Sequence, residues 1–283
     1  MPSNKKDPLG DRMKRYEMEN AGRRLMQRLP IMARLDGRSF HTFTKGLDLP
    51  YDSGFSRCMI ETTRYLVDKF EAHLGYTQSD EITLFWRNEK WDEEKPMPTP
   101  AEMMFDGRIQ KWTSLLAAGA SVNFNQQVGF FLPKCNHLSP IFDCRVFQLP
   151  NTTEVYNNFL WRELDATKNS VSMAAQALYT QKELHKKNTA NMHDLMIAKG
   201  VNWNDYPQFF KRGTYVSRVK VQEYLTEAEI ERIPEKNRPL GPITRTKVVA
   251  LNMEPLTAYG NWTELMNHME PEGSIKPRIT PLD

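Results

Sequence analysis

Two short acidic segments of the chain have residue types suited to chemistry on phosphates. Asp36 and Gly37 follow the apolar run PIMARL, and Ser79, Asp80 and Glu81 lie between the segments LGYTQ and ITLFW. In nucleotidyl transfer the attacking hydroxyl and the leaving pyrophosphate both develop negative charge, and two divalent ions about 3.5–4 Å apart stabilise both oxygens. Aspartates at the ends of rigid strands are suitable ligands for such ions. Asp36 and Asp80 are therefore predicted to be metal ligands.

The predicted ions are two Mg²⁺, because hard carboxylate and carbonyl oxygens suit this metal. Gly37 could add its main-chain carbonyl, since a residue without a side chain lets the backbone approach an ion closely. The 3 cysteines, Cys58, Cys135 and Cys144, show no paired metal spacing and are predicted to be reduced thiols. Taken singly, an Asp-Gly pair after a strand is also typical of a turn, and Ser-Asp-Glu of a solvated loop. Their joint placement at two strand ends favours a site.

Hydrophobic periodicity predicts the elements that must position these carboxylates. A buried strand over residues 30–35 is followed by an amphipathic helix over residues 55–74 and by a pair of strands around the second acidic segment. A helix near residues 112–122, a strand over residues 142–147 and a helix from about residue 152 complete the series. This order predicts an α+β fold with a βαββαβ sheet and helices on one face. If the first strand is central, Asp36 and Asp80 become neighbours.

The last of these helices has a plausible start signal, because Asn151 is followed three residues later by Glu154. Its inner face is predicted to carry Leu160, Trp161, Leu164, Val171 and Leu178.

Length and composition limit the class of protein. The chain has 283 residues and 40% apolar content, enough for one substantial core. Its 38 basic residues barely exceed its 35 acidic ones, so any RNA site must be a local patch. The break IPEKNRPLGP predicts a catalytic domain over 1–232 and a C-terminal extension of unknown role over 233–283, and residues 88–100 are expected to form an exposed loop. No signal core and no membrane-spanning run is found, which predicts a cytoplasmic protein.

At the acidic segments the sequence resembles the tRNA-His guanylyltransferases and the related Thg1-like reverse polymerases. RLDGRSFHTFTK (residues 34–45) and GYTQSDEITLFW (residues 75–86) are similar to the two most specific motifs of this family. FDGRIQKWTSLLAA, PIFDCRVFQLPN, WRELDATKNS, HKKNTANMHDLM and FFKRGTYV resemble later motifs, so the resemblance extends from about Met26 to Val216.

The resemblance implies a palm-like domain, similar to that of polymerases and nucleotide cyclases, in a homotetramer. It also implies the addition of nucleotides to the 5′ end of tRNA in the 3′-to-5′ direction. ATP or GTP activates the 5′-monophosphate, and the 3′-hydroxyl of an incoming nucleotide, typically GTP, then attacks. A 5′-triphosphorylated RNA needs no activation.

Carried over residue by residue, the resemblance makes Asp36 and Asp80 catalytic metal ligands, gives Gly37 a carbonyl ligand and makes Glu81 a supporting catalytic carboxylate. The further nucleotide-binding positions that it implies are Arg38, Ser39, Phe40, His41, Asp52, Ser79, Arg108 and Lys111, with Arg34 as a weaker candidate for the phosphates. Phe40 and His41 could instead pack against the sheet, and an Arg-x-x-Lys pattern is also typical of a solvated helix face.

Basic and polar positions after the acidic segments are candidates for binding tRNA. They are Arg162, Lys168, Asn169, Lys187, Lys211 and Arg212. Where the eukaryotic members of the family have His-Ile-Asn-Asn, this chain has Thr167, Lys168, Asn169 and Ser170. The difference favours the broader reverse-polymerase branch over strict tRNA-His specificity.

Two other functions fit parts of the pattern. A nucleotide cyclase or signalling nucleotide synthase uses a similar palm and carboxylate pair, but it has no need of the later basic positions. A non-catalytic RNA-binding module of ferredoxin-like topology would stack bases on sheet aromatics and would not need carboxylates where RNA binds.

Overall fold

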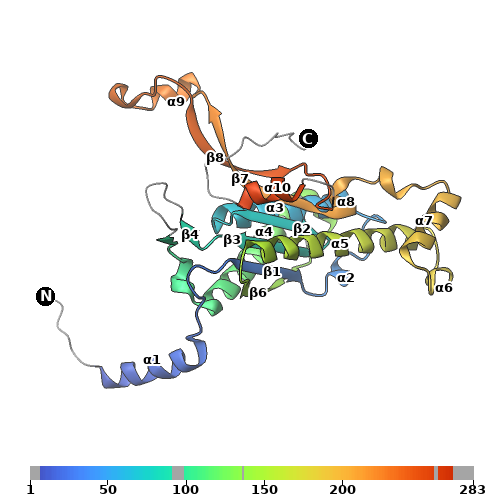
Figure 1. Ribbon diagram of the computed structural model, residues 1–283, viewed down its shortest axis with the longest axis horizontal. Coiled ribbons are helices and arrows are strands. Elements are labelled where there is room, and N and C mark those ends of the chain that lie inside the picture. The colour runs from blue at the N-terminus through green and yellow to red at the C-terminus, as the bar shows by residue number, and fades with distance from the viewer. Residues whose placement is uncertain (1–6, 91–98, 136, 258–260, 270–283) are drawn as a thin grey trace.

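The computed structural model describes residues 7–90, 99–135, 137–257 and 261–269. Its main feature is a six-stranded antiparallel sheet with the order β6-β1-β3-β2-β7-β8 (Figure 1). The strands are β1 (Ile31–Gly37), β2 (Leu74–Gln78), β3 (Glu81–Trp86), β6 (Phe142–Gln148), β7 (Thr214–Glu223) and β8 (Ile243–Leu251). β4 (Glu89–Lys90) and β5 (Thr99–Pro100) form a second, two-stranded sheet. The predicted α+β class and the central position of the first strand are confirmed.

Three long helices connect the strands in the predicted order. They are α3 (Ser53–Lys69), α4 (Ile109–Phe131) and α5 (Thr152–Gln176). The shorter helices are α1 (Pro8–Ala21), α2 (Phe40–Phe43), α6 (Gln181–Leu184), α7 (Thr189–Ala198), α8 (Gln208–Arg212), α9 (Glu227–Glu231) and α10 (Asn261–Met269). Four 3₁₀ turns lie at Met104–Gly107, Pro133–Cys135, Trp203–Asp205 and Glu235–Asn237. None of the helices described is long and apolar enough to cross a membrane.

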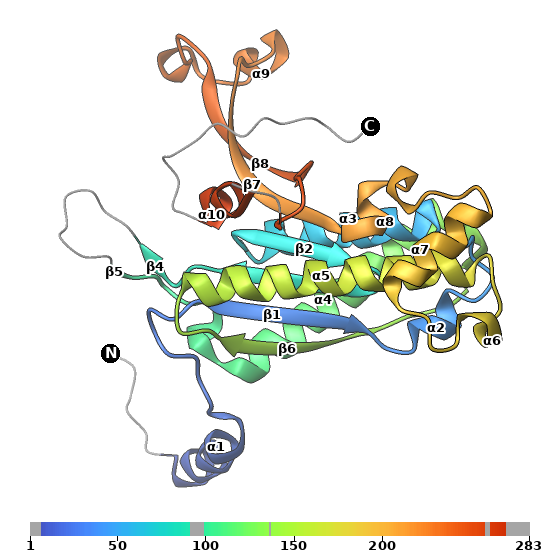
Figure 2. The same cartoon turned by 45° about the vertical axis from the view of Figure 1, so that its right-hand side comes forward.

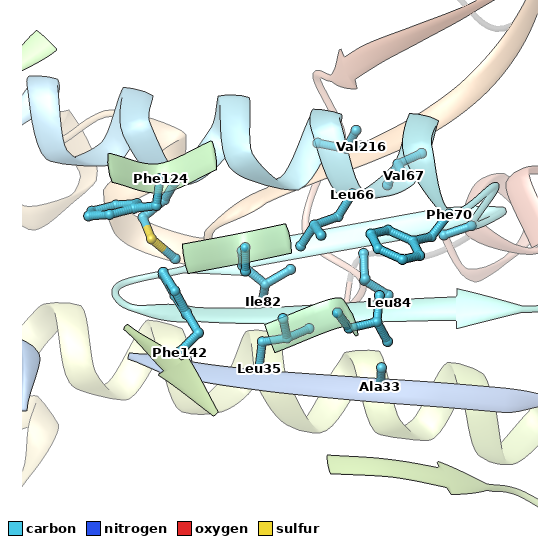
Figure 3. Packing of buried hydrophobic residues seen from close by; sticks show 14 of the residues in the cluster. Ala33, Leu35, Leu66, Val67, Phe70, Ile82, Leu84, Phe124, Phe142 and Val216 are labelled. Carbon is cyan, nitrogen blue, oxygen red and sulfur yellow. The ribbon is translucent and has the colours of Figure 1, made fainter. Parts of the chain in front are cut away.

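The helices cover both faces of the sheet, so the prediction of helices on one face is wrong. Alternate residues of a strand point to opposite faces. Leu35 and Leu84 face α3 and α4, where they pack with Leu66 and Phe124 (Figure 3). Met32, Phe85 and Tyr76 face the other way and pack with Phe159 of α5 and Leu265 of α10. A strand buried on both faces has no polar face, and its sequence therefore gives no sign of which side the next helix covers.

Helix α5 begins where the sequence predicted, because the Asn151 side chain accepts a 2.9 Å hydrogen bond from the Glu154 amide. Its inner face was predicted only in part. Val171 is buried, but Trp161 and Leu164 are 52% and 50% exposed. Arg162 and Glu163 take the inner positions instead, at 6% and 3% exposure. Apolar periodicity cannot find a helix face whose buried residues include a charged pair.

Glu163 connects α5 to the C-terminal part of the chain. Its carboxylate accepts hydrogen bonds from the Tyr215 hydroxyl at 3.0 Å and from the Leu256 amide at 2.9 Å. Met253, Leu256 and α10 then cover the α5 face of the sheet. Burial raises the pKa of Glu163, while these two hydrogen bonds lower it.

The hairpin of β7 and β8 extends beyond the body of the molecule and carries α9 at its end (Figure 2). Because β8 pairs with β7 along its length, the predicted boundary between residues 232 and 233 falls at the tip of this hairpin, between two strands of one sheet. Helix α1 also lies apart from the body. Most of the predicted loop over residues 88–100 lies outside the described residues.

Candidate active site

The two predicted metal carboxylates meet at one end of the sheet. Asp36 is the sixth residue of β1 and lies directly across from Glu81, the first residue of β3. Asp80 and Ser79 form the turn between β2 and β3. The Gly37 amide donates a 3.0 Å hydrogen bond to the Asp80 carbonyl, which holds the end of β1 against this turn. The predicted neighbourhood of Asp36 and Asp80 is therefore present in the structure.

A row of acidic residues crosses three strands at this end of the sheet. Asp36 pairs with Glu81 of β3 on one side and with Asp143 of β6 on the other. Residues directly opposite each other in antiparallel strands project from the same face of the sheet. All three side chains therefore lie on the face that α5 covers, and so does Arg34, two residues before Asp36.

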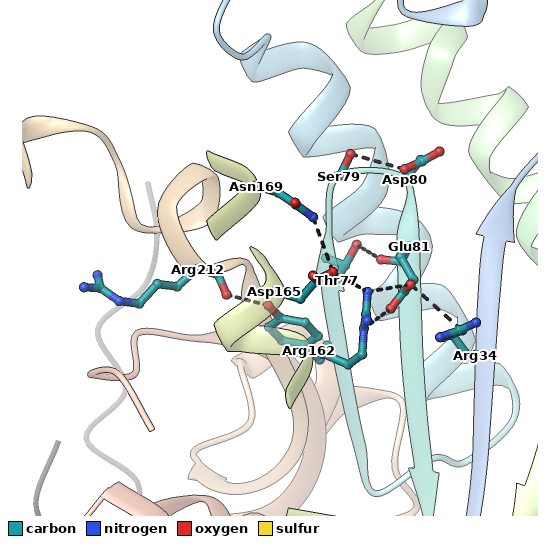
Figure 4. Close-up of polar contacts among 10 residues, drawn as sticks. Arg34, Thr77, Ser79, Asp80, Glu81, Arg162, Asp165, Asn169 and Arg212 are labelled. Atoms are coloured by element: carbon teal, nitrogen blue, oxygen red, sulfur yellow. Dashed lines mark hydrogen bonds and ion pairs between the residues drawn. The ribbon is translucent and has the colours of Figure 1, made fainter. Parts of the chain in front are cut away.

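Glu81 is held from the opposite side by Arg162 of α5 (Figure 4). The guanidinium donates two hydrogen bonds to the carboxylate, from Nε at 2.6 Å and from Nη2 at 2.8 Å. Arg162 Nη2 also contacts Asp165 at 3.2 Å, and Arg34 forms a longer ion pair with Glu81 at 3.9 Å. Asn169, one turn further along α5, donates to Asp165 at 3.3 Å. This network joins α5 to the strand end that follows Asp80.

A depression of about 400 Å³ lies over this network. Its lining residues come from the strand ends and from one side of α5: Asp36, Gln78, Ser79, Asp80, Glu81, Arg162, Asp165, Asn169, Ser172, Met173 and Gln176. Two carboxylates without a cation partner therefore open into a solvent-filled space large enough for part of a nucleotide.

The electrostatics of the site favour a bound cation. Burial is the main cause that raises the pKa of Asp80, and the charge of Asp36 raises it further. Burial also raises the pKa of Glu81, but Arg162 and Arg34 oppose that shift. Neither Asp36 nor Asp80 has an ion-pair partner within the described ranges of the chain. A divalent ion would remove the repulsion between them.

The donor set fits Mg²⁺ that is also held by its substrate. Among the described residues there is no group of three or more His, Cys, Asp or Glu side chains that could hold a metal. Mg²⁺ usually binds through one or two carboxylates together with substrate phosphates and water, so a complete protein cage is not required. Asp36 and Asp80 line the depression and meet this smaller requirement.

Gly37 is needed for packing as well. A Cβ at this position would lie 2.4 Å from Cδ2 of Phe40. The ring of Phe40 is 2% exposed and packs with Phe43, Phe124 and Phe142. The Phe40 side chain therefore packs in the core, as the alternative interpretation of the sequence had it, and it does not line the depression.

Gly37→Ala is expected to destabilise the protein by about 1–3 kcal/mol, because the new methyl group must displace the Phe40 ring from a filled core. Urea unfolding measures this. Gly241→Ala is the matched control, since a Cβ there meets nothing within 4 Å. Equal unfolding free energies for the two variants would show that the contact with Phe40 does not constrain position 37.

The other residues of the first motif lie just beyond β1. Arg38, Ser39 and His41 are exposed, and Ser39 has a φ of 57°. Arg38 donates its main-chain amide to the Ile141 carbonyl at 2.9 Å, while its guanidinium has no partner among the residues described. Asp52 has a structural role, because its side chain accepts a hydrogen bond from the Phe55 amide at 2.9 Å and caps α3.

Arg108 and Lys111 are not brought to the carboxylates within one chain. The Arg108 guanidinium donates to the Phe105 carbonyl at 3.2 Å just before α4. One turn on, Trp112 packs against Trp86, which pairs with Ile31 at the start of β1. Six residues of β1 separate that end from Gly37, or about 20 Å at 3.3 Å per residue. Hydrophobic periodicity predicts that a helix exists here, but it does not predict at which end of the sheet that helix begins.

The predicted tRNA-binding residues fall into three environments. Arg162 is buried and its guanidinium is paired with Glu81, at the edge of the depression. Lys211 and Arg212 pack against the Trp203 ring at 5.6 and 5.2 Å, and burial lowers the pKa of Lys211. Lys168 and Lys187 are exposed, and their ammonium groups have no hydrogen-bond or ion-pair partner in the described segments, whereas Asn169 lines the depression.

Sequence reasoning missed Asp165 and Gln78, which line the depression, and Asp143, which lies beside Asp36 but outside it. Asp143 and Arg145 are two residues apart in β6, as Arg34 and Asp36 are in β1, so each pair projects from one face of the sheet. This matching spacing of charges is a sequence signal for Asp143. Asp165 and Asn169 are four residues apart, which places them on one side of a helix. Gln78 precedes the acidic turn directly, and nothing in its type marks it.

Comparisons with known proteins identify relatives of this chain by sequence and by structure. A sequence profile described as tRNAHis guanylyltransferase (Thg1) matches residues 10–150. A bacterial tRNA(His) guanylyltransferase (Thg1)-like protein in complex with ATP is 39% identical, with a TM-score of 0.66 over 74% of this chain and 88% of that one. A bacterial Thg1-like protein in complex with GTP is 33% identical, with a TM-score of 0.62 over 86% and 91%. An uncharacterized protein of Acanthamoeba polyphaga mimivirus is 31% identical over 75% of this chain and 77% of its own length.

Proposed function

The chain belongs to the tRNAHis guanylyltransferase (Thg1) family of nucleotidyltransferases, and from this premise we propose that it adds nucleotides in the 3′-to-5′ direction to the 5′ end of tRNA with two Mg²⁺. The observation that supports the proposal most is the pair of carboxylates, Asp36 and Asp80, that open into one depression without a cation partner. Paired aspartates of this kind suit the stabilisation of the attacking and leaving oxygens in phosphoryl chemistry.

Each residue of the site has a separate task in this proposal. Asp36, Asp80 and the Gly37 carbonyl hold the ions, which when bound polarise the phosphates and neutralise developing charge. Glu81 is a positioning residue, because both its oxygens are occupied by Arg162. Ser79 donates to Asp80 Oδ1 at 3.2 Å and orients that carboxylate. The exposed guanidinium of Arg38 is the nearest free cation in sequence to Asp36 and is assigned to nucleotide phosphates.

We further propose that the reaction uses two nucleotides in turn. The 5′-monophosphate of tRNA attacks ATP or GTP and releases pyrophosphate, which leaves a nucleotidylated 5′ end. The 3′-hydroxyl of an incoming nucleotide then attacks that end and displaces the nucleoside monophosphate. Two structural relatives are in complex with ATP and with GTP, which supports both nucleotides as substrates. The proposal also includes the homotetramer and the cytoplasmic location expected from the sequence. In such a tetramer, Arg108 and Lys111 would bind the nucleotide phosphates at the site of a neighbouring copy.

The enzyme is expected to prefer templated repair over addition of an untemplated guanosine. The segment Thr167 to Ser170 lacks the family's histidine, and Ser170 is buried against Trp203 and Lys211. Only Lys168 and Asn169 of the four are exposed. With few groups to recognise one tRNA, base pairing would supply the discrimination.

The assay compares a 5′-monophosphorylated tRNA that lacks its first nucleotide with an intact tRNA-His, each given ATP and one of the four triphosphates at a time. The expected result is a higher kcat/KM for the nucleotide that restores a Watson–Crick pair. A higher kcat/KM for guanosine on intact tRNA-His would favour strict guanylylation. Addition to neither RNA would contradict the proposed function itself.

The other two functions are less well supported. Membership of a nucleotidyltransferase family contradicts a non-catalytic RNA-binding module. A nucleotide cyclase would use the same carboxylates, but the family profile that matches is one of tRNA enzymes.

A further inference from the structure

A second depression lies further along α5 than the one over the carboxylates. It has a volume of about 640 Å³ and lies at the C-terminal end of α5. Its lining residues are Gln176, Ala177, Leu178, Tyr179, Thr180, Gln181 and Glu183. Gln176 lines both depressions, so the two meet at this side chain.

One side of α5 forms the floor between them. Asn169, Ser172, Met173 and Gln176 recur at helical spacing, and we call them the polar face of α5. Met173 is 39% exposed, and the Gln176 amide has no hydrogen-bond partner in the described part of the chain. Asn169 uses its amide nitrogen on Asp165, which leaves its carbonyl oxygen available (Figure 4).

The chemistry of this face suits bases and ribose hydroxyls better than phosphates. Arg162 is the single cation among the described lining residues of both depressions, and Glu81 already occupies it. Amide and hydroxyl side chains recognise the edges of unpaired bases, and an exposed apolar side chain can lie against a base. Single-stranded RNA is the ligand whose bases are free for such contacts.

The proposed reaction places single-stranded RNA here. At the end of the tRNA acceptor stem, the 3′ strand continues past the 5′ end at which addition occurs. From Asn169 to Gln176, the polar face extends for about 10 Å at 1.5 Å per residue. That length accommodates about three nucleotides if they stack at 3.4 Å each.

We propose that the polar face of α5 binds the unpaired 3′-terminal nucleotides of the tRNA, which positions the template base beside Asp36 and Asp80. The inference rests on the proposed function for its ligand, and it adds Ser172, Met173 and Gln176 as recognition residues. They would act on affinity and on placement of the RNA, without taking part in the chemical step.

The test is a double-mutant cycle between protein and RNA. Kd is measured for a tRNA that lacks its first nucleotide and for the same RNA without the unpaired nucleotides beyond the template base. Wild type is compared with Asn169→Ala and Gln176→Ala, and Gln126→Ala on α4 is the matched control for the substitution. kcat/KM for templated addition is measured on the same pairs.

Each polar-face variant is expected to bind the complete RNA about tenfold more weakly than wild type, the effect of one or two lost hydrogen bonds, and the shortened RNA equally well. Equal losses on both RNAs, or wild-type affinity in both variants, would overturn the inference. Wild type that distinguishes the two RNAs in binding but adds nucleotides to neither would support this site while contradicting the proposed function. Wild type that adds nucleotides but binds both RNAs equally would overturn the site alone.

Discussion

Asp36→Asn and Asp80→Asn are each expected to lower the rate of nucleotide addition at least about a hundredfold, because the loss of one metal carboxylate removes about 3 kcal/mol or more of transition-state stabilisation. Both variants should remain folded. Asparagine keeps the size of the side chain and removes the repulsion that raises the pKa of Asp80. The measurement is single-turnover addition to a 5′-truncated tRNA at saturating Mg²⁺.

Thermal unfolding with and without Mg²⁺ provides a readout that is independent of activity. An ion that binds only the folded protein raises the Tm. The Mg²⁺-dependent rise should be present in wild type and small in both variants. Asp143→Asn is a useful comparison, because Asp143 lies beside Asp36 but outside the depression. Near-normal turnover in Asp36→Asn or Asp80→Asn would remove the proposed metal site.

Arg162→Ala is expected to destabilise the protein by about 3–5 kcal/mol, since it leaves the buried Glu81 carboxylate with only the longer ion pair to Arg34. Glu81 is 8% exposed and receives two hydrogen bonds from Arg162, so water cannot easily replace them. Urea unfolding gives the free energy. Arg245→Ala is the control: this arginine pairs with Glu223 and Glu229 on the exposed hairpin, where the loss should stay below about 1 kcal/mol.

The double variant Glu81→Leu with Arg162→Met separates the two roles of the pair. Apolar residues of similar size can replace a buried ion pair at little cost, so stability should recover. Nucleotide addition should not recover, because the network that joins α5 to the acidic turn is lost. The salt dependence of tRNA binding tests the alternative: a slope reduced by about one in Arg162→Ala would mean that this guanidinium contacts a phosphate.

The sequence was sufficient for the strand end that carries Asp36 and for the turn that carries Asp80. Their neighbourhood followed from the order of strands and helices alone, because a central first strand must pair with the strand after that turn. The start of α5 at Asn151 could be predicted from a local capping signal. These features depend on residues close together in the chain or on topology.

The features that could not be predicted depend on which face of an element is buried. The periodicity that predicted a helix over residues 55–74 passed through Leu74, but Leu74 begins β2. Arg162 was a candidate for tRNA binding because basic positions after the acidic segments suit contacts with an RNA backbone. Its burial follows from Glu81, eighty-one positions earlier in the chain, and no local pattern connects them. The roles assigned to individual nucleotide-binding residues remain predictions.

The contacts of Glu163 have a consequence for how the protein matures. Arg162 and Glu163 are adjacent on α5, and the first serves the carboxylate site while the second accepts the Leu256 amide. A ribosome makes the chain from its N-terminus, so α5 emerges long before Leu256 and α10. Until they arrive, Glu163 has the Tyr215 hydroxyl as a partner but lacks the Leu256 amide, and Phe159 and Tyr76 lack the cover of Leu256 and α10. The α5 face of the sheet is thus covered only after residues 253–269 have been made, later than every strand of the sheet.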